Sequence, residues 1–484
     1  MTISMTIRRN AIQRALAASI ALALGGCALQ GPPAAVAASA PAQWQAPLPH
    51  NGSLTDLASW WQHQGDSLLV ELITDAQQVS PTIAAAGTRI AQARADRVAS
   101  GAALAPTLDA TGSVVRTSQQ SSQPSGTTSQ AALQASWEID VFGANRATRD
   151  AAQERYDSAR AQWHDARVSV AAEVANQYYA LRACQQLQGV AEQDAVSRRD
   201  SARLTELSAG AGFQPPANAA LARASAAEGA SRAIEQRAAC DVSVKALVAL
   251  SAMPEAALRQ KLAASPFVAP SPVAIADLPA QTLAQRPDIY SAEREVAAAS
   301  FEVRGAQAQR YPRLSLAGSI GKGNIRSGGT SITASTWSIG PLAVSLPIFD
   351  GGTRRAQIAA ATARYDEAVV KYRAGVRQAV REVEEALVNL ASTDERSEHA
   401  KTALEGYRVS FVATEDRYKN GLASLIELED ARRTRLAAEN TVVNLERERS
   451  AAWVALYRAA GGGWNSGSAS NNTGSTNAIA NNAP

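Results

Sequence analysis

The sequence predicts a mostly α-helical protein with a smaller β-strand part, built from two similar halves. Three observations lead to this fold class. The 484-residue chain has two long stretches without proline, residues 125–214 and 348–483, which favour long helices. Four segments of about ten residues alternate between apolar and polar side chains, as strands with two different faces do. Short motifs of the first half recur in the second half at a nearly constant distance.

The first 26 residues have the features of a signal peptide. Three arginines precede the apolar run 15–24, whose ten residues are too few to span a bilayer as a helix. The run ends in Leu24-Gly25-Gly26-Cys27, which resembles the lipobox at which bacterial lipoproteins are cut and acylated. We therefore expect residues 1–26 to be removed and Cys27 to carry the lipid of an outer-membrane lipoprotein. A plain signal peptide followed by an incidental cysteine is the alternative.

The charge of the mature chain excludes one class of partner. Residues 27–52 are rich in alanine and proline without helical periodicity, so we expect a lipidated, extended N-terminal tether. The chain has 47 Lys and Arg against 44 Asp and Glu, and three of the arginines lie in the signal peptide, which leaves 44 charges of each sign. A chain without net charge lacks the electrostatic footprint of a nucleic-acid-binding protein.

The sequence gives no indication of an enzyme. The glycine-rich segment 461–464 lacks the Lys-Ser/Thr of a phosphate-binding loop. Glu384 and Glu385 are neighbours on a predicted helix and point in different directions, so we expect a solvated helix face rather than a catalytic pair. The four histidines are spaced too widely for local metal-ligand pairs. We expect no catalytic residue, no metal, and no cofactor apart from the lipid on Cys27.

After the tether the chain consists of two repeats, expected at 53–266 and 267–463. Pro81 and Pro106 recur as Pro287 and Pro312, in both cases 206 residues later. Motifs further along recur 209 residues later: Tyr156-Asp157 as Tyr365-Asp366, Glu173-Val174 as Glu382-Val383, Gly212 as Gly421, and Ala246-Leu247 as Ala455-Leu456. A drift of three residues between these offsets indicates an internal gene duplication.

Each repeat has the predicted order helix, strand, strand, long helix, turn, long helix. We expect strands at about 106–117, 129–142, 312–325 and 335–349, and coiled-coil hairpins at about 144–262 and 352–460. The segment 464–484 consists of small and polar residues and is expected to be a disordered tail.

The strands have one apolar and one polar face. Leu133, Ala135 and Trp137 alternate with polar neighbours, and the fourth strand changes register near Gly340-Pro341, as a β-bulge allows. This alternation suits a transmembrane barrel wall and equally a soluble sheet packed on helices. The outer-membrane address and the long helices favour the barrel.

Four strands cannot close a barrel, because the smallest bacterial barrels have about eight, and lipid does not tolerate an open sheet edge. The chain is therefore expected to form an oligomer, with Trp137 and Trp337 close to lipid.

Several motifs together resemble the outer-membrane factor family of tripartite efflux systems, the TolC-like channels, and within it the NodT-like lipoproteins. Besides the lipobox, these are Arg286-Pro287-Asp288-Ile289, Tyr311-Pro312, Pro347-Ile348-Phe349-Asp350-Gly351-Gly352, Tyr418-Lys419-Asn420-Gly421, and the closing Gly461-Gly462-Gly463-Trp464. The first hairpin departs from the family pattern at Phe213-Gln214-Pro215-Pro216, where the partner protein would dock.

The resemblance implies a homotrimer whose twelve strands form one barrel and whose twelve helices continue as a periplasmic tunnel. It also implies an outer-membrane channel that passively exports small molecules such as drugs, together with a periplasmic adaptor protein and an inner-membrane pump of the RND type. A conduit for type I protein secretion and a non-channel coiled-coil tethering lipoprotein are the alternatives.

A candidate gate follows the second turn. Ile426, Asp430 and Arg433 have the spacing i, i+4, i+7 of one helical stripe. By resemblance to the family motif after the Tyr-x-x-Gly turn, they correspond to the constriction at the periplasmic end of the channel. An ordinary Asp430–Arg433 pair on a solvated face is the alternative.

Two cysteines lie at equal distances from the first turn. Cys184 precedes Gly212 by 28 residues and Cys240 follows it by 28 residues, so they are expected to face each other on antiparallel helices. In the oxidising periplasm such a pair forms a disulfide when the Cα atoms come within about 7 Å. Two buried free thiols are the alternative.

Overall fold

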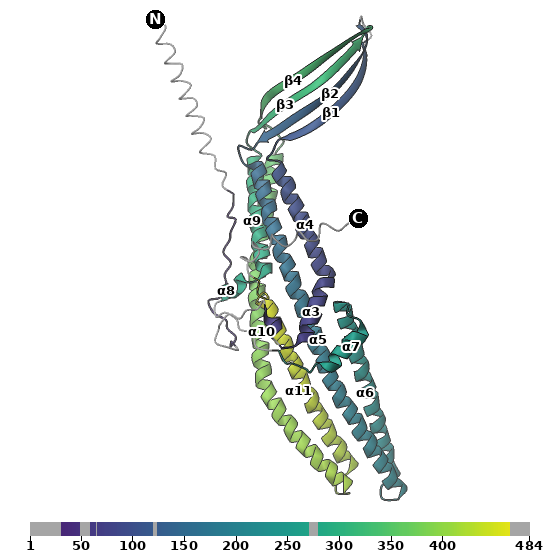
Figure 1. Cartoon of the computed structure of the whole chain (residues 1–484). Coiled ribbons are helices and arrows are strands. Elements are labelled where there is room, and N and C mark those ends of the chain that lie inside the picture. The colour runs from purple at the N-terminus through teal and green to yellow at the C-terminus, as the bar shows by residue number, and fades with distance from the viewer. Residues whose placement is uncertain (1–30, 49–58, 64, 120–122, 271–278, 465–484) are drawn as a thin grey trace. The chain divides into compact units, whose positions relative to one another are not determined.

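The computed structural model describes residues 31–48, 59–63, 65–119, 123–270 and 279–464 (Figure 1). The signal peptide, Cys27 and the segment 465–484 lie outside the described residues. Contacts divide the chain into two compact units, each made from three stretches of sequence. The first consists of residues 1–37, 89–159 and 291–373, and the second of residues 38–88, 160–290 and 374–484.

The first unit contains the sheet. Its four strands are β1 (Thr107–Gln119), β2 (Gln123–Ile139), β3 (Arg313–Ser327) and β4 (Thr330–Ser345), all antiparallel and in the order β1-β2-β3-β4. The helices α4 (Pro81–Ala102) and α9 (Pro287–Ala308) precede β1 and β3, and the helices α5 (Ala144–Gly210) and α10 (Thr353–Lys419) follow β2 and β4. The predicted fold class, mostly helical with a β part and a repeated element order, is confirmed.

The register of the sheet collects the apolar side chains on one face. Leu133 of β2 pairs with Ala110 of β1 and Ile320 of β3, and Ile320 pairs with Trp337 of β4. Because residues directly opposite each other in an antiparallel sheet point to the same face, these four side chains form one row. Neighbouring rows on this face hold Leu108, Trp137, Leu316, Ile339, Leu342 and Val344. Most of these large side chains are exposed in the single chain; Trp337 is 74% exposed.

The irregularity in the pairing of β3 with β4 lies where the sequence predicts a bulge. The pairing of β3 with β4 shifts between Leu316 and Gly318, opposite the cis peptide bond Gly340–Pro341. Gly340 has a φ of 109°, a conformation that side chains disfavour, and proline has no N–H to donate to the ladder. The bulge keeps the apolar residues on both sides of it on one face, because Leu342 and Ile339 pair with Leu316 and Gly318.

The second unit consists of helices. It contains the remainder of α5 and α10 together with α2 (Trp60–His63), α3 (Ser67–Val79), α6 (Pro216–Ser251), α7 (Glu255–Ala264), α8 (Pro279–Ala284) and α11 (Leu425–Ala459). Its core is formed by buried side chains such as Leu69, Tyr178, Leu247, Leu387 and Trp453. None of the helices in the described ranges combines the length and the apolar composition needed to cross a lipid bilayer.

One helix boundary and one residue of the expected tail differ from the sequence expectation. The first hairpin was expected to reach residue 262, but α6 ends at Ser251. Ala252 has a left-handed φ of 54° and Pro254 follows, so the helix stops and α7 begins separately. Trp464, expected to begin the disordered tail, is only 6% exposed and packs against the Tyr290 ring at 5.0 Å.

The N-terminal segment is held by hydrogen bonds within each unit, and Trp44 and Ala46 belong to the core of the second. In the first unit, the Ser300 hydroxyl donates to the Pro32 carbonyl at 2.5 Å and the Tyr365 hydroxyl donates to the Pro33 carbonyl at 2.9 Å. In the second unit, the backbone N–H groups of Gln45 and Ala46 donate to the Glu384 carboxylate at 2.6 and 2.8 Å. Glu384 therefore holds the N-terminal segment, where the sequence led us to expect only a solvated helix face.

Candidate functional site: the ends of the two hairpins

Both long helices end in the same kind of turn. α5 ends at Gly210, Gly212 after it has a left-handed conformation (φ 80°), and the N–H of Phe213 donates to the Ser208 carbonyl at 2.9 Å. α10 ends at Lys419, Gly421 after it is likewise left-handed (φ 72°), and the N–H of Leu422 donates to the Arg417 carbonyl at 2.7 Å. This hydrogen bond across five residues, with glycine just before its donor, is a Schellman motif. Each motif reverses the chain, so each pair of helices forms a hairpin.

The helices that follow the turns begin differently. α6 begins with Pro215 and Pro216, which have no N–H to satisfy and no side chain that caps the helix. α11 begins with Ser424, whose hydroxyl accepts from the Glu427 N–H at 3.2 Å while the Glu427 carboxylate accepts from the Ser424 N–H at 2.7 Å. The hydrogen bonds from the Ser424 N–H and hydroxyl, together with the charge of Arg417, lower the pKa of Glu427.

The two hairpins contact each other near their ends. The hydroxyl groups of Thr205 on α5 and Tyr418 on α10 lie 2.6 Å apart. Close to this contact a small apolar cluster contains Ala202, Ala222, Phe411, Leu425 and Leu428. The cluster takes side chains from α5, α6, α10 and α11, so the four helices of the two hairpins share it.

A buried group of four charges joins α5 to α11. Arg198 donates to Asp194 at 2.8 Å and to Glu429 at 2.5 Å, and Arg432 donates to the other oxygen of Glu429 at 2.5 Å. Arg432 also donates to the hydroxyl groups of Ser197 and Ser201 at 3.0 and 2.9 Å. The Arg432 side chain is fully buried, those of Asp194 and Arg198 are 3% and 7% exposed, and that of Glu429 is 20% exposed.

Local sequence features make room for this group. A Cβ atom at Gly229 on α6 would lie 2.7 Å from Cδ of Arg198, so a larger residue there would displace the arginine. Ser225, also on α6, accepts a hydrogen bond from Arg198 at 2.6 Å. Burial lowers the pKa of Arg432, and the nearby charges of Glu429 and Asp194 act in the opposite direction. Two positive and two negative charges balance, which is the condition under which buried charges are tolerated.

The sequence did not single out this group. Asp194 and Arg198 have the i, i+4 spacing of an ordinary exposed pair, and Glu429 and Arg432 the i, i+3 spacing. The only local signal was the row of small residues, Ser197, Ser201, Ser225 and Gly229, which leaves space between helices.

The candidate gate residues lie on the exposed side of α11. Ile426 is 65% exposed. Arg433 donates to Asp430 at 2.9 Å, and their side chains are 77% and 58% exposed. Their neighbours on the helix, Leu428 and Arg432, are buried. In the single chain the structure thus brings Asp430 and Arg433 together as an intrahelical pair and leaves the Ile426 side chain facing outward.

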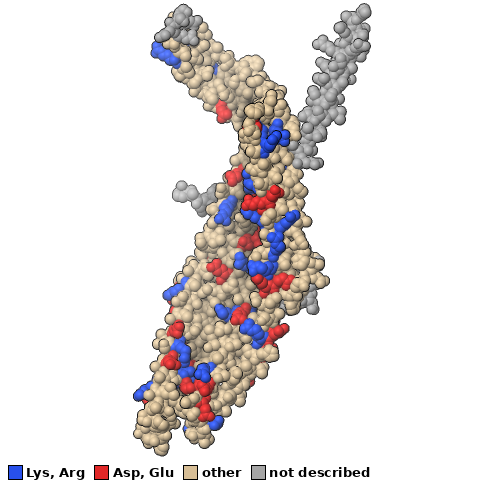
Figure 2. Space-filling model, turned by 180° about the vertical axis from the view of Figure 1, so that it is seen from behind, with Lys and Arg blue, Asp and Glu red and all other residues tan. Residues whose placement is uncertain are grey.

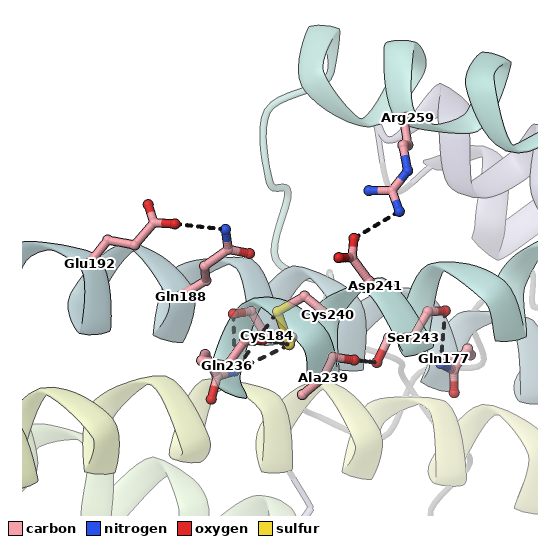
Figure 3. The surroundings of a disulfide bond; sticks show 10 residues. All are labelled: Gln177, Cys184, Gln188, Glu192, Gln236, Ala239, Cys240, Asp241, Ser243 and Arg259. Carbon is pink, nitrogen blue, oxygen red and sulfur yellow. Dashed lines mark hydrogen bonds and ion pairs between the residues drawn. A yellow bond between two sulfur atoms is a disulfide. The ribbon is translucent and has the colours of Figure 1, made fainter. Parts of the chain in front are cut away.

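The two cysteines are joined in the structure. The sulfur atoms of Cys184 and Cys240 are 2.04 Å apart and the Cα atoms 5.6 Å apart, linking α5 to α6 (Figure 3). The Gln236 side-chain amide donates to the Cys184 carbonyl at 3.4 Å beside the bond. Both cysteines are buried.

The Arg286-Pro287-Asp288 motif fastens the start of α9. Arg286 is buried and donates to Asp288 at 2.7 Å, to Glu382 of α10 at 2.8 Å and to the Ala459 carbonyl of α11 at 2.9 Å. Burial by itself would lower the pKa of Arg286, but the hydrogen bonds and charges of Asp288 and Glu382 outweigh it and raise this pKa. The motif is thus explained by packing among three helices.

Within the described ranges, no group of three or more His, Cys, Asp or Glu side chains could hold a metal ion. An open groove of about 510 Å³ does lie between α5 and α10 near the hairpin ends. Its polar lining includes Glu192, Asp200, Glu415, Tyr418 and Lys419.

Comparisons with known proteins agree over almost the whole chain. The profile of the family described as "Outer membrane efflux protein" matches residues 72–252 and 278–462. The chain is 30% identical over 462 residues to the pyoverdine export outer membrane protein OpmQ of Pseudomonas aeruginosa, covering 93% of this chain and 96% of OpmQ. It is 30% identical over 472 residues to the outer membrane protein OprJ of the same species, covering 93% and 95%. The structure superposes on the outer-membrane channel OprN with a TM-score of 0.80 and 27% identity, covering 90% of this chain and 99% of OprN.

Proposed function

Because the chain belongs to the outer membrane efflux protein family, we propose that it exports small molecules passively, as a homotrimeric duct. It is an outer-membrane efflux channel protein and not an enzyme. In this proposal, three chains enclose one pore, the energy comes from a separate pump, and the duct carries small molecules such as drugs or toxic compounds from the periplasm to the exterior.

The observation that supports a trimer is the four-stranded sheet with one apolar face. Within the described chain, β1 and β4 are the two edges of this sheet, and each has one side without a neighbouring strand. Three such sheets joined edge to edge give twelve strands, an even number that closes a barrel and leaves no edge in lipid. The exposed apolar face, with Trp337 and Ile339 on it, would then contact lipid, and the polar face would line the pore.

We propose a periplasmic adaptor and an inner-membrane pump of the RND type as partners. The names of OpmQ and of other relatives, such as the toluene efflux pump outer membrane protein TtgI of Pseudomonas putida, describe components of export systems. The groove between α5 and α10 offers the Asp200 carboxylate to a basic side chain of such an adaptor, while Glu192 and Glu415 already pair with Arg237 and Lys419. A lipid on Cys27 would add an anchor in the outer membrane.

We propose that Ile426, Asp430 and Arg433 form the closed gate. Three-fold symmetry would turn each of these exposed side chains into a ring around the pore, and the Asp430–Arg433 pair could then extend to neighbouring chains. The structure of the single chain supports this in one respect, because all three side chains face away from the buried interior of the helix pair.

Planar-bilayer conductance of the purified protein tests the proposal. A trimer by light scattering and stable single-channel currents are expected, and Asp430→Ala with Arg433→Ala should raise the conductance. Glu367→Ala with Lys371→Ala is the matched control, since this exposed pair on α10 lies far from the hairpin ends in sequence. A monomer without conductance would instead favour a tethering lipoprotein, and release of a co-expressed secreted protein would favour a type I conduit. Equal conductance of the gate variant and the control in a folded trimer would refute the gate.

A further inference from the structure

The apolar face of the sheet changes character toward the turn at Gly328 and Gly329. Near the helices its rows hold large apolar side chains such as Leu316 and Leu342. The change occurs at Lys322, which pairs with Ala131 and Ser335 and therefore shares this face with them. The next row consists of Val114, Ser129, Asn324 and Thr333, and the row beyond it of Arg116, Thr127, Arg326 and Ser331. A polar, basic zone thus follows the apolar band on the same face.

The charges of the strands are divided between the two faces. Arg116, Lys322 and Arg326 lie on the face that carries the apolar band. The other charged residues of the four strands are Asp109, Glu138 and Arg313, and they lie on the opposite face and near the helices. In Figure 2, basic atoms lie beside the grey residues at the tip of the sheet, and the acidic atoms on that part of the surface lie nearer the helices.

The three basic residues have no carboxylate within reach in their own hairpins. Residues 313–345 contain no Asp or Glu, and residues 107–139 contain only Asp109 and Glu138, which lie at the other end of the strands. Arg116 and Arg326 flank Thr127 in one row, so their Cα atoms are about 10 Å apart across two strand spacings. All three basic side chains are exposed. An anion with several oxygens would satisfy them.

The surface beside Lys322 is hollowed. An open depression of about 490 Å³ is lined on this face by Lys322, Asn324, Ser129 and Thr333. Gly112 and Ala131 line it as well, and their small size leaves the space. The Asn324 amide donates to the Thr333 hydroxyl at 2.8 Å within this lining, and to the Ser331 hydroxyl of the next row at 2.9 Å. The hollow therefore offers the Lys322 ammonium group and the hydroxyl groups of Ser129 and Thr333 to a head group.

The position of the basic zone fits the boundary of a lipid layer. Leu314 and Lys322 are eight residues apart, about 26 Å along a strand, and about 20 Å along the bilayer normal at a tilt near 40°. Arg326 lies four residues further along the strand, at about 30 Å. Because the apolar band of an outer-membrane barrel is about 25 Å tall, Lys322 would lie at its upper edge with its ammonium group reaching outward, and the arginines would lie at head-group level.

We propose that Lys322, Arg116 and Arg326 bind the phosphate groups of the phosphorylated glycolipid in the outer leaflet. The inference rests on the proposed function, because only a barrel inserted with its helices in the periplasm exposes this zone to that leaflet. Lipid is favoured over a soluble anion because the basic zone continues directly from the apolar band, so one molecule can contact both with its acyl chains and its phosphates. Arginine binds phosphate in a bidentate manner, and lysine adds a point charge.

The test uses the full-length trimer in detergent and two forms of lipid A with identical acyl chains, one with both phosphates and one with neither. We expect the wild-type protein to bind the phosphorylated form at least about tenfold more tightly, since each basic residue near an anionic lipid surface contributes roughly fivefold. Arg116→Gln with Lys322→Gln and Arg326→Gln should remove this preference. Arg313→Gln, on the same strand as Lys322 but on the opposite face, is the matched control and should keep it.

The outcomes separate this inference from the proposed function. Equal binding of both lipid forms by the wild-type protein, or an unchanged preference in the triple variant, overturns the lipid inference. If single-channel conductance is present in the same preparations, the proposed channel function still stands. Competition by inorganic phosphate at the same molar concentration as the lipid would also overturn the lipid inference, because the site would then recognise free phosphate. If neither the wild-type protein nor any variant shows single-channel conductance, the result counts against the proposed channel function instead.

Discussion

Replacing Arg432 by methionine should loosen the end of α11, because it leaves buried carboxylates with too few partners. The Arg432 side chain is fully buried, and methionine replaces it with an uncharged side chain that is two atoms shorter. Glu429 then loses its hydrogen bond to Arg432, and Arg198 must balance Glu429 and Asp194 with help only from the half-exposed Arg232, which lies 3.6 Å from Asp194. Removing one member of a buried ion pair costs about 3 to 5 kcal/mol. Since Glu429 is 20% exposed and water can partly replace the arginine, we expect the lower value, about 3 kcal/mol.

Hydrogen exchange of the backbone amides in residues 425–435 measures this effect in the intact trimer. A cost of about 3 kcal/mol corresponds to roughly 150-fold faster exchange through local opening. The neighbouring Arg433 gives a matched control, because its pair with Asp430 is exposed and Arg433→Met should change exchange by about twofold or less. Arg432→Met combined with Glu429→Gln should restore most of the protection, since the remaining Arg198–Asp194 pair is balanced. Equal exchange in Arg432→Met and Arg433→Met would refute the reasoning.

Three further predictions concern other parts of the chain. Periplasmically matured protein digested without reductant should yield the Cys184–Cys240 cross-linked peptide, and alkylation of both thiols in the unreduced protein would contradict the disulfide. Because the disulfide closes a loop of 56 residues, Cys184→Ser should lower the free energy of unfolding of the first hairpin by up to about 4 kcal/mol. Glu384→Gln should expose the segment 31–48 to proteolysis, because the charge that accepts two backbone N–H groups is lost, whereas Glu385→Gln removes only an exposed pair with Arg381 and should leave the cleavage rate unchanged. Burial, together with Arg167 and Arg160, lowers the pKa of His164 to about 4 from an unfolded value near 6.5, so protonation of His164 favours the unfolded state, and its contribution to stability is kept above pH 6.5 and lost as the pH falls toward 4. The midpoint temperature of thermal unfolding should therefore fall less steeply between pH 7 and 5 in His164→Gln than in the wild-type protein, and equal slopes would disprove this origin.

The fold could be predicted largely because its signals are periodic and repeated. The absence of proline, the alternation in the strands and the duplicated motifs each extend over many residues, so a few deviating residues do not obscure them. The bulge at Gly340–Pro341 was visible because proline has no N–H for the ladder and rarely occurs within a paired strand unless the strand is irregular there. The disulfide pair followed from equal distances to Gly212, which is simple geometry once the hairpin is recognised.

What the sequence did not reveal depends on partners far apart in the chain. Glu384 accepts hydrogen bonds from residues 338 and 339 positions earlier, and nothing near Glu384 indicates this. Arg198 and Glu429 are 231 positions apart, and their local patterns are those of exposed helical pairs. The gate residues differ from these cases because their contact is local. Asp430 and Arg433 in one chain form the same pair that an ordinary solvated helix would show. Their role depends on symmetry, which a single chain does not contain.

The equal lengths of α5 and α10 restrict how this protein can change in evolution or by design. Each helix has 67 residues and lies between two fixed points, a paired strand at its beginning and the Thr205–Tyr418 contact near its end. One inserted residue in α5 alone would lengthen it by about 1.5 Å and turn everything after it by about 100°. Placed between Cys184 and Arg198, it would separate Cys184 from Cys240 and Arg198 from Glu429. Insertions and deletions in the hairpins should therefore be tolerated only as matched pairs of about seven residues, two full turns, made in both repeats together.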